Sequence, residues 1–123
     1  MPQKIHRECG DSTKLVVATT TFAERSQATQ MAKLVIEQKA AACAQVGGPI
    51  ESYYRWEGQI CQETEWRLTI KSTTLALPRL RDLVLANHPY RQPQWVVLEA
   101  IGTTAGYENW VRDSVELEGL EDV

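Results

Sequence analysis

The spacing of apolar residues changes along the chain and divides it into predicted strands and helices. Residues 14–21 form a short, β-branched apolar run, which is typical of a central strand. Residues 23–40 instead carry apolar side chains three or four positions apart, the stripe of an amphipathic helix: Ala28, Met31, Ala32, Val35, Ile36 and Ala40. We therefore expect the fold to open with a strand followed by a helix.

Two strand-like arms follow, residues 42–56 and residues 59–71. They flank a turn at Gly58, which can supply the positive φ that a tight hairpin needs. In the second arm apolar and polar residues alternate, with Trp66, Leu68 and Ile70 on one face. Residues 47–49 (Gly-Gly-Pro) interrupt the first arm, which predicts a bulge or a sharp bend there.

The second half of the chain predicts a helix, a strand and a final helix. The helix covers residues 74–87, with Thr74 as its cap, Pro78 in its first turn and Pro89 just beyond its end. Residues 94–101 read as a buried strand, and helical spacing returns across residues 107–115. The order strand, helix, strand, strand, helix, strand predicts an α+β, ferredoxin-like βαββαβ sandwich with a C-terminal helix added.

The predicted hairpin is too long for one small domain. Each arm is at least twice the usual strand length of roughly five or six residues, so the hairpin should overhang. It would expose apolar side chains that soluble proteins cover: Tyr53, Tyr54, Trp56 and Ile60. The aromatic residues can serve as a stacking platform for a ligand, but a subunit interface is the favoured interpretation. Identical chains that cover one another usually close into a ring.

Composition narrows the classes of function. The chain has 123 residues, 43% apolar and 24% charged, which suits one globular domain over residues 14–116. Its net charge of -3 disfavours nucleic acid and anionic lipid as partners. Residues 1–13 are expected to be a disordered leader and residues 117–123 an acidic tail. With no apolar run of ~20 residues and no signal-peptide pattern, a cytoplasmic location is expected, with reduced thiols.

Several linked motifs resemble those of the CutA (divalent-cation tolerance) family. They are the hairpin tip at residues 52–58 (SYYRWEG), the strand at residues 63–71, the turn His88-Pro89-Tyr90 with Pro93, and the pair Tyr107 and Trp110. The similarity covers residues 14–115. It implies a ferredoxin-like subunit in a PII-like homotrimer, with a part in tolerance of, or response to, copper and other divalent cations, and no enzymatic activity.

The resemblance also implies a weak metal site. Some members are described as binding copper through a cysteine near the end of the first strand and a His-His pair before Pro-Tyr. Those positions here resemble Thr19, Asn87 and His88, of which only His88 is a good copper ligand. A copper or other divalent-cation site would therefore need His88 together with Cys43, a neighbouring subunit or water, and its affinity should be weak.

Each candidate residue also has a structural interpretation. His88 can simply interact with the terminal carbonyls of the helix that precedes it. Cys43 is expected to be a buried, inert core residue, because free cysteine is among the most buried residue types. Three glutamates around the hairpin can form a carboxylate site, but solvation is expected for them: Glu57, Glu63 and Glu65.

Two other functions fit the predicted fold. One is a signalling or scaffold trimer that binds a small molecule or a partner protein in clefts between subunits. The other is an acylphosphatase-like hydrolase, but residues 47–49 lack the Lys-Ser/Thr of a phosphate-binding loop and precede a strand. No nucleophile elbow or zinc-type histidine pair is present in the sequence, so enzyme readings have no support.

Overall fold

The computed structural model of the protein describes residues 13–116. Along the chain the elements are β1 (Leu15–Phe22), α2 (Arg25–Glu37), β2 (Cys43–Trp56), β3 (Gln59–Thr73), α3 (Leu77–Asn87), β4 (Val96–Glu99) and α4 (Ala105–Val115). The expected leader, apart from Thr13, and the expected acidic tail lie outside the described residues.

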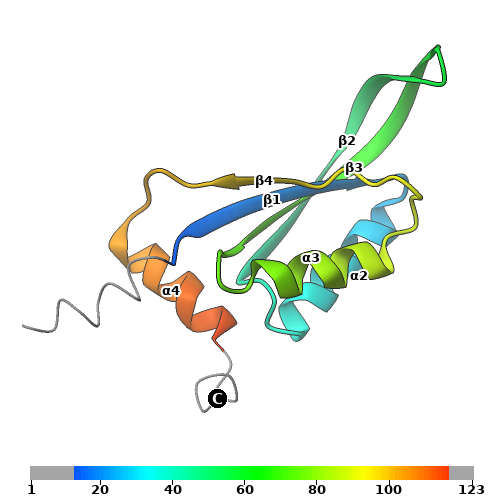
Figure 1. Ribbon diagram of the computed structural model, residues 1–123. Coiled ribbons are helices and arrows are strands. Elements are labelled where there is room, and N and C mark those ends of the chain that lie inside the picture. Colours follow the sequence, from blue (N-terminus) through cyan, green and yellow to red (C-terminus); the bar gives the residue numbers. More distant parts are fainter. Residues whose placement is uncertain (1–12, 117–123) are drawn as a thin grey trace, which may run out of the picture.

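Within residues 13–116 the four strands form one antiparallel sheet in the order β2-β3-β1-β4. Helices α2 and α3 lie side by side along one face of it, and α4 lies near the end where β1 begins (Figure 1). This arrangement confirms the predicted ferredoxin-like α+β fold with an added C-terminal helix. No helix within the described part of the chain is long and apolar enough to cross a membrane.

The core fills the space between the sheet and the two helices. Its largest strand residues are Phe22, Leu68 and Ile70, all at most 1% exposed, as the alternation in β3 predicts for the last two. Helix α2 contributes Ala28, Met31 and Val35 from the predicted stripe. Ile36 is 40% exposed, because it lies at the edge of the stripe in the last turn of a helix that ends at Glu37, earlier than predicted.

Two element boundaries differ from the sequence-based predictions. Thr74 does not cap α3: the N-cap is Ala76, whose N–H donates to Thr73 Oγ1 (3.1 Å). Thr74 Oγ1 instead accepts from the N–H of Lys14 (3.0 Å) and ties β1 to β3. Strand β4 is shorter than residues 94–101, because it pairs only with Val16–Thr19 of β1. Beyond Thr19, the side chain of His88 takes the place of β4 and bonds Thr20 and Thr21.

The hairpin of β2 and β3 extends well beyond the rest of the molecule (Figure 1), as its length predicted. Its turn has positive φ at Glu57 (50°) and Gly58 (80°). The predicted bend is a β-bulge between Gly47 and Ile50. Gly47 pairs with Arg67 and Ile50 with Glu65, so β2 carries one residue more than β3 across this interval.

The extra residue reverses which side chains of β2 face each side of the sheet. Before the bulge, odd-numbered residues such as Gln45 share a side with Thr69, away from α2. After the bulge, even-numbered residues share that side, so Ile50, Ser52 and Tyr54 join it. The bulge therefore decides which polar side chains of the hairpin meet the open face of the sheet.

The bulge should tolerate a side chain at Gly47 but not at Gly48. Gly48 has φ +144°, and a Cβ there would lie 2.9 Å from Trp66 Cε3 and 3.1 Å from the carbonyl oxygen of Glu65. Nothing lies within 4 Å of a Cβ at Gly47. We predict that Gly48→Ala lowers the free energy of unfolding by about 1–3 kcal/mol, measured by denaturant titration. The matched variant Gly47→Ala should lose clearly less, and equal losses would contradict the role given to the bulge.

Candidate functional site

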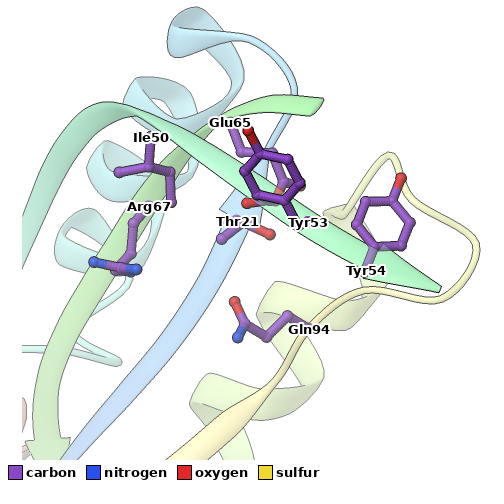
Figure 2. Close-up of a pocket in the computed structure, with 8 residues that line it drawn as sticks. Thr21, Ile50, Tyr53, Tyr54, Glu65, Arg67 and Gln94 are labelled. Atoms are coloured by element: carbon purple, nitrogen blue, oxygen red, sulfur yellow. The ribbon is translucent and has the colours of Figure 1, made fainter. Parts of the chain in front are cut away.

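A cavity of about 330 Å³ lies where the hairpin leaves the sheet. It opens on the face away from α2 and α3, because Thr21 and Arg67 line it and their neighbours Thr20 and Leu68 face the core. Strand β2 contributes Ile50, Ser52, Tyr53 and Tyr54, and the segment between α3 and β4 contributes Gln94 (Figure 2). Every lining residue except Ile50 carries a polar group on its side chain, so the cavity suits a small polar ligand.

Glu65 is the most deeply placed charge of this cavity. It is 9% exposed, and its Oε2 accepts a hydrogen bond from the Tyr90 hydroxyl (2.8 Å). Burial and then the bond to Glu65 raise the pKa of Tyr90 well above its usual value, so the hydroxyl keeps its proton and donates. The expectation that the hairpin glutamates are solvated holds for Glu57 and Glu63 but is wrong for Glu65.

Arg67 places a positive charge on the same face as Glu65. The two residues are two positions apart on β3, which separates their backbones by about 7 Å. Arg67 is exposed, and Gly47 opposite it has no side chain to cover it. Among the described residues, no carboxylate oxygen lies within 4 Å of its guanidinium. The cavity therefore holds two opposite charges that do not neutralise each other directly.

Tyr54 stands at the outer side of the cavity and is 41% exposed. The pKa of its hydroxyl is raised, first by lost hydration and then by the negative charge of Glu63. The hydroxyl is therefore protonated at neutral pH and can donate a hydrogen bond. Of the other predicted hairpin residues, Tyr53 is 66%, Trp56 48% and Ile60 73% exposed in the single chain.

His88 joins the end of α3 to β1 rather than to the carbonyls of its own helix. Its Nδ1 accepts the N–H of Tyr90 (3.1 Å), so the proton of the neutral ring is on Nε2. Nε2 lies 3.0 Å from both the carbonyl oxygen of Thr21 and Oγ1 of Thr20. The ring stacks on Phe22, with centroids 4.4 Å apart and an interplanar angle of 12°. Both ring nitrogens are thus engaged in holding the segment that carries Tyr90.

The structure does not bring the two candidate metal ligands together within one chain. Cys43 pairs with Lys71, and Lys71 pairs with Val17. His88 lies at Thr20 and Thr21, at least three residues and about 10 Å further along the sheet. Within residues 13–116 no group of three or more His, Cys, Asp or Glu side chains could hold a metal ion.

Cys43 is half-buried, so the expectation that it is a buried core residue is wrong for the single chain. The physical reason is its place on edge strand β2, where its side chain lies on the open face with Lys71. Tyr107 of α4 is beside it: burial and then Cys43 raise the pKa of the Tyr107 hydroxyl. The positions that resemble the other copper ligands hold no thiol or imidazole, and Asn87 Nδ2 donates to the carbonyl of Leu83 (2.8 Å).

The chain thus belongs to the class of ferredoxin-like proteins that carry a long, bulged hairpin, here with a cavity at the hairpin base. The model of the family CutA1 divalent ion tolerance protein matches residues 16–114, and the chain belongs to this family. It is 34% identical to the divalent-cation tolerance protein CutA of Thermus thermophilus over 98 residues, 80% of this chain and 95% of that protein. With the CutA of Escherichia coli K12 it shares 31% identity over 108 residues, 88% and 96% of the two chains.

Comparison with solved structures also identifies proteins of the CutA family. The CutA of Synechococcus elongatus superposes with a TM-score of 0.80 at 35% identity, covering 84% of this chain and 91% of that one. The same protein in complex with a Bis-Tris molecule superposes with a TM-score of 0.76 at 34% identity, covering 83% and 94%. A CutA from Archaeoglobus fulgidus, 28% identical with a TM-score of 0.79 over 83% of this chain and 99% of that one, is described as periplasmic.

The hydrogen bonds of His88 predict a pH dependence of stability. Burial lowers the pKa of His88 below its usual 6.5. As pH falls through about 6.5, the unfolded chain takes up the proton before the folded one, so stability present above that pH is lost below it. We expect the free energy of unfolding to fall more steeply between pH 7 and pH 5 in the native protein than in His88→Asn. Asn does not titrate, and its oxygen can replace Nδ1. Denaturant titrations with equal slopes for both proteins would contradict this.

Proposed function

We propose that this chain acts as a PII-like homotrimer in the tolerance of divalent cations, without catalysis of its own. Family membership supports the role in tolerance. The observation that supports self-association is the hairpin: the apolar residues Trp56 and Ile60 stand 48% and 73% exposed on an arm that has left the core. Such a surface is usually covered by a partner. That the closed ring has three members rests on the family resemblance.

The backbone of the hairpin favours the same conclusion. Strand β2 is an edge strand of 14 residues, and within the described part of the chain its outer side pairs with no strand. Long edges of this kind are protected against uncontrolled pairing. The bulge at Gly47 and Gly48 limits pairing along the edge, and association with identical chains would cover the rest.

Mutation of one hairpin residue should weaken the assembly. Light scattering of the native protein should give about three times the chain mass of 13.9 kDa. Ile60→Asp buries a charge in the proposed interface and should shift the mass toward that of the monomer at low concentration. Leu75→Asp is the matched control, because Leu75 is 76% exposed and follows the other end of β3. A monomeric native protein, or equal effects of the two variants, would refute the interface.

We further propose that any copper or other divalent cation is bound weakly, with His88 and Cys43 as the candidate ligands. The only lone pair of the neutral His88 ring, on Nδ1, already accepts the N–H of Tyr90, so coordination must break that bond. Cys43 can join such a site only from another subunit or after rearrangement. Metal binds neutral imidazole and thiolate, so a protonated His88 and the thiol of Cys43 must each lose a proton first.

Calorimetric titration with Cu(I), Cu(II) and Zn(II) tests this proposal. Binding should be in the micromolar range or weaker and should fade as pH falls through about 6.5. His88→Ala should abolish the binding that exists and leave the trimer intact, because the hairpin holds the subunits. Titration of Cys43→Ser tests separately whether the thiol of Cys43 contributes to metal binding. Tight copper binding that survives His88→Ala would place the metal site elsewhere.

A second candidate function is the binding of a small molecule in a cleft between subunits. The cavity at the hairpin base supports it, as does the complex of the Synechococcus relative with Bis-Tris, an amine with several hydroxyl groups. Tyr53 and Tyr54 both line the cavity and belong to the proposed interface, so a neighbouring subunit would close it. We place this activity in the cytoplasm, where Cys43 and Cys61, both free in the structure, would stay reduced.

A further inference from the structure

We propose that the cavity at the base of the hairpin binds a small zwitterion, a molecule with a protonated amine and a carboxylate a few bonds apart. The proposal rests on the small-molecule function above and names the chemical class of its ligand. It assigns the amine to Glu65 and the carboxylate to Arg67, the two charges that line the cavity.

Glu65 supplies the site for the amine. Glu65 as a residue is 9% exposed, and burial of a charge is costly unless an opposite charge or hydrogen bonds compensate. Tyr90 donates one hydrogen bond to Oε2 but brings no charge. Among residues 13–116, no Lys, Arg or His nitrogen lies within 4 Å of Glu65. Glu65 lines the cavity, so a ligand there can contact its carboxylate.

Arg67 supplies the site for the carboxylate. A guanidinium presents a planar fork of donors that matches a carboxylate with two parallel hydrogen bonds. The fork of Arg67 is exposed, and among the described residues it has no acidic partner within 4 Å. Figure 2 shows the guanidinium at one side of the cavity, with Glu65 and Gln94 on the others.

The spacing of the two charges selects a molecule that carries both groups. Their backbones are about 7 Å apart on one face of β3, and the side chains do not pair with each other. A ligand between them can neutralise both, whereas an amine alone leaves Arg67 unpaired and a simple anion also meets the negative charge of Glu65. Thr21, Ser52 and Gln94 add neutral hydrogen-bonding groups. The volume of about 330 Å³ limits the ligand to a small metabolite.

A series of ω-amino acids tests both the charges and their spacing. The native protein is titrated calorimetrically with glycine, β-alanine, 4-aminobutyrate and 5-aminovalerate, and with n-butylamine and butyrate as single-charge controls. We expect affinity to rise along the series to an optimum at one of the two longer amino acids. That optimum should exceed butylamine and butyrate by about tenfold or more, the worth of one charge-assisted hydrogen-bonded pair. Equal affinities for the best zwitterion and for butylamine would overturn the role of Arg67.

Variants assign each end of the ligand. Glu65→Gln keeps an oxygen for the Tyr90 hydroxyl and should lower affinity for the best zwitterion at least about tenfold, while binding of butyrate is kept. Arg67→Gln should also lower the affinity for the best zwitterion, but it should keep the binding of butylamine and not that of butyrate. Glu63→Gln is the matched control, since Glu63 is an exposed glutamate on the same strand outside the cavity lining. Equal losses in all three variants would overturn the assignment.

Bis-Tris separates failure of this inference from failure of the small-molecule function. Bis-Tris carries an amine and hydroxyl groups but no carboxylate. If it binds and its binding depends on Glu65 while no zwitterion binds more tightly, the cavity is an amine site and the zwitterion class is wrong. If neither Bis-Tris nor any member of the series binds the assembled protein, the small-molecule function itself fails.

Discussion

The one extra residue at the β-bulge of β2 is the constraint on which the rest of the structure depends. Side chains in a strand alternate between faces, so a single added residue reverses every later position. Here it turns Ser52 and Tyr54 toward the open face that also carries Glu65 and Arg67. Without it, Tyr53 and Arg55 would take those places, and the polar cavity at the hairpin base would be lined differently. Only glycine suits the φ of +144° that the bulge requires at Gly48.

The same bulge links the cavity to the proposed assembly. The hairpin bends at its base, so its distal part leaves the domain while its proximal part stays on the sheet (Figure 1). Tyr53 and Tyr54 lie at the transition, where they line the cavity and belong to the proposed interface. A ligand that binds only between subunits stabilises the assembled state by RT ln(1 + [L]/Kd). In that arrangement, binding and association favour each other by thermodynamic necessity.

The sequence predicted much of the fold, because strand alternation, helical stripes and the glycine-rich bend are local signals. It missed features that depend on contacts between distant segments. Glu65 resembled a solvated hairpin glutamate, yet Tyr90, 25 residues later, covers it. Likewise, β4 begins only at Val96, because His88 bonds Thr20 and Thr21 at the end of β1 that lies beside the start of β4. The motif His88-Pro89-Tyr90 indicated that the turn mattered, but no spacing rule shows which strand a turn will bond.

His88 also connects the question of metal to the question of the ligand. Its ring holds the backbone of Tyr90 through Nδ1, and the hydroxyl of Tyr90 holds Glu65 in the cavity. A metal that took the lone pair of Nδ1 would therefore release the segment that positions Glu65. Metal at His88 and an amine at Glu65 would then oppose each other, since each requires a different state of the same short segment. In this chain the imidazole is built into the support of the cavity.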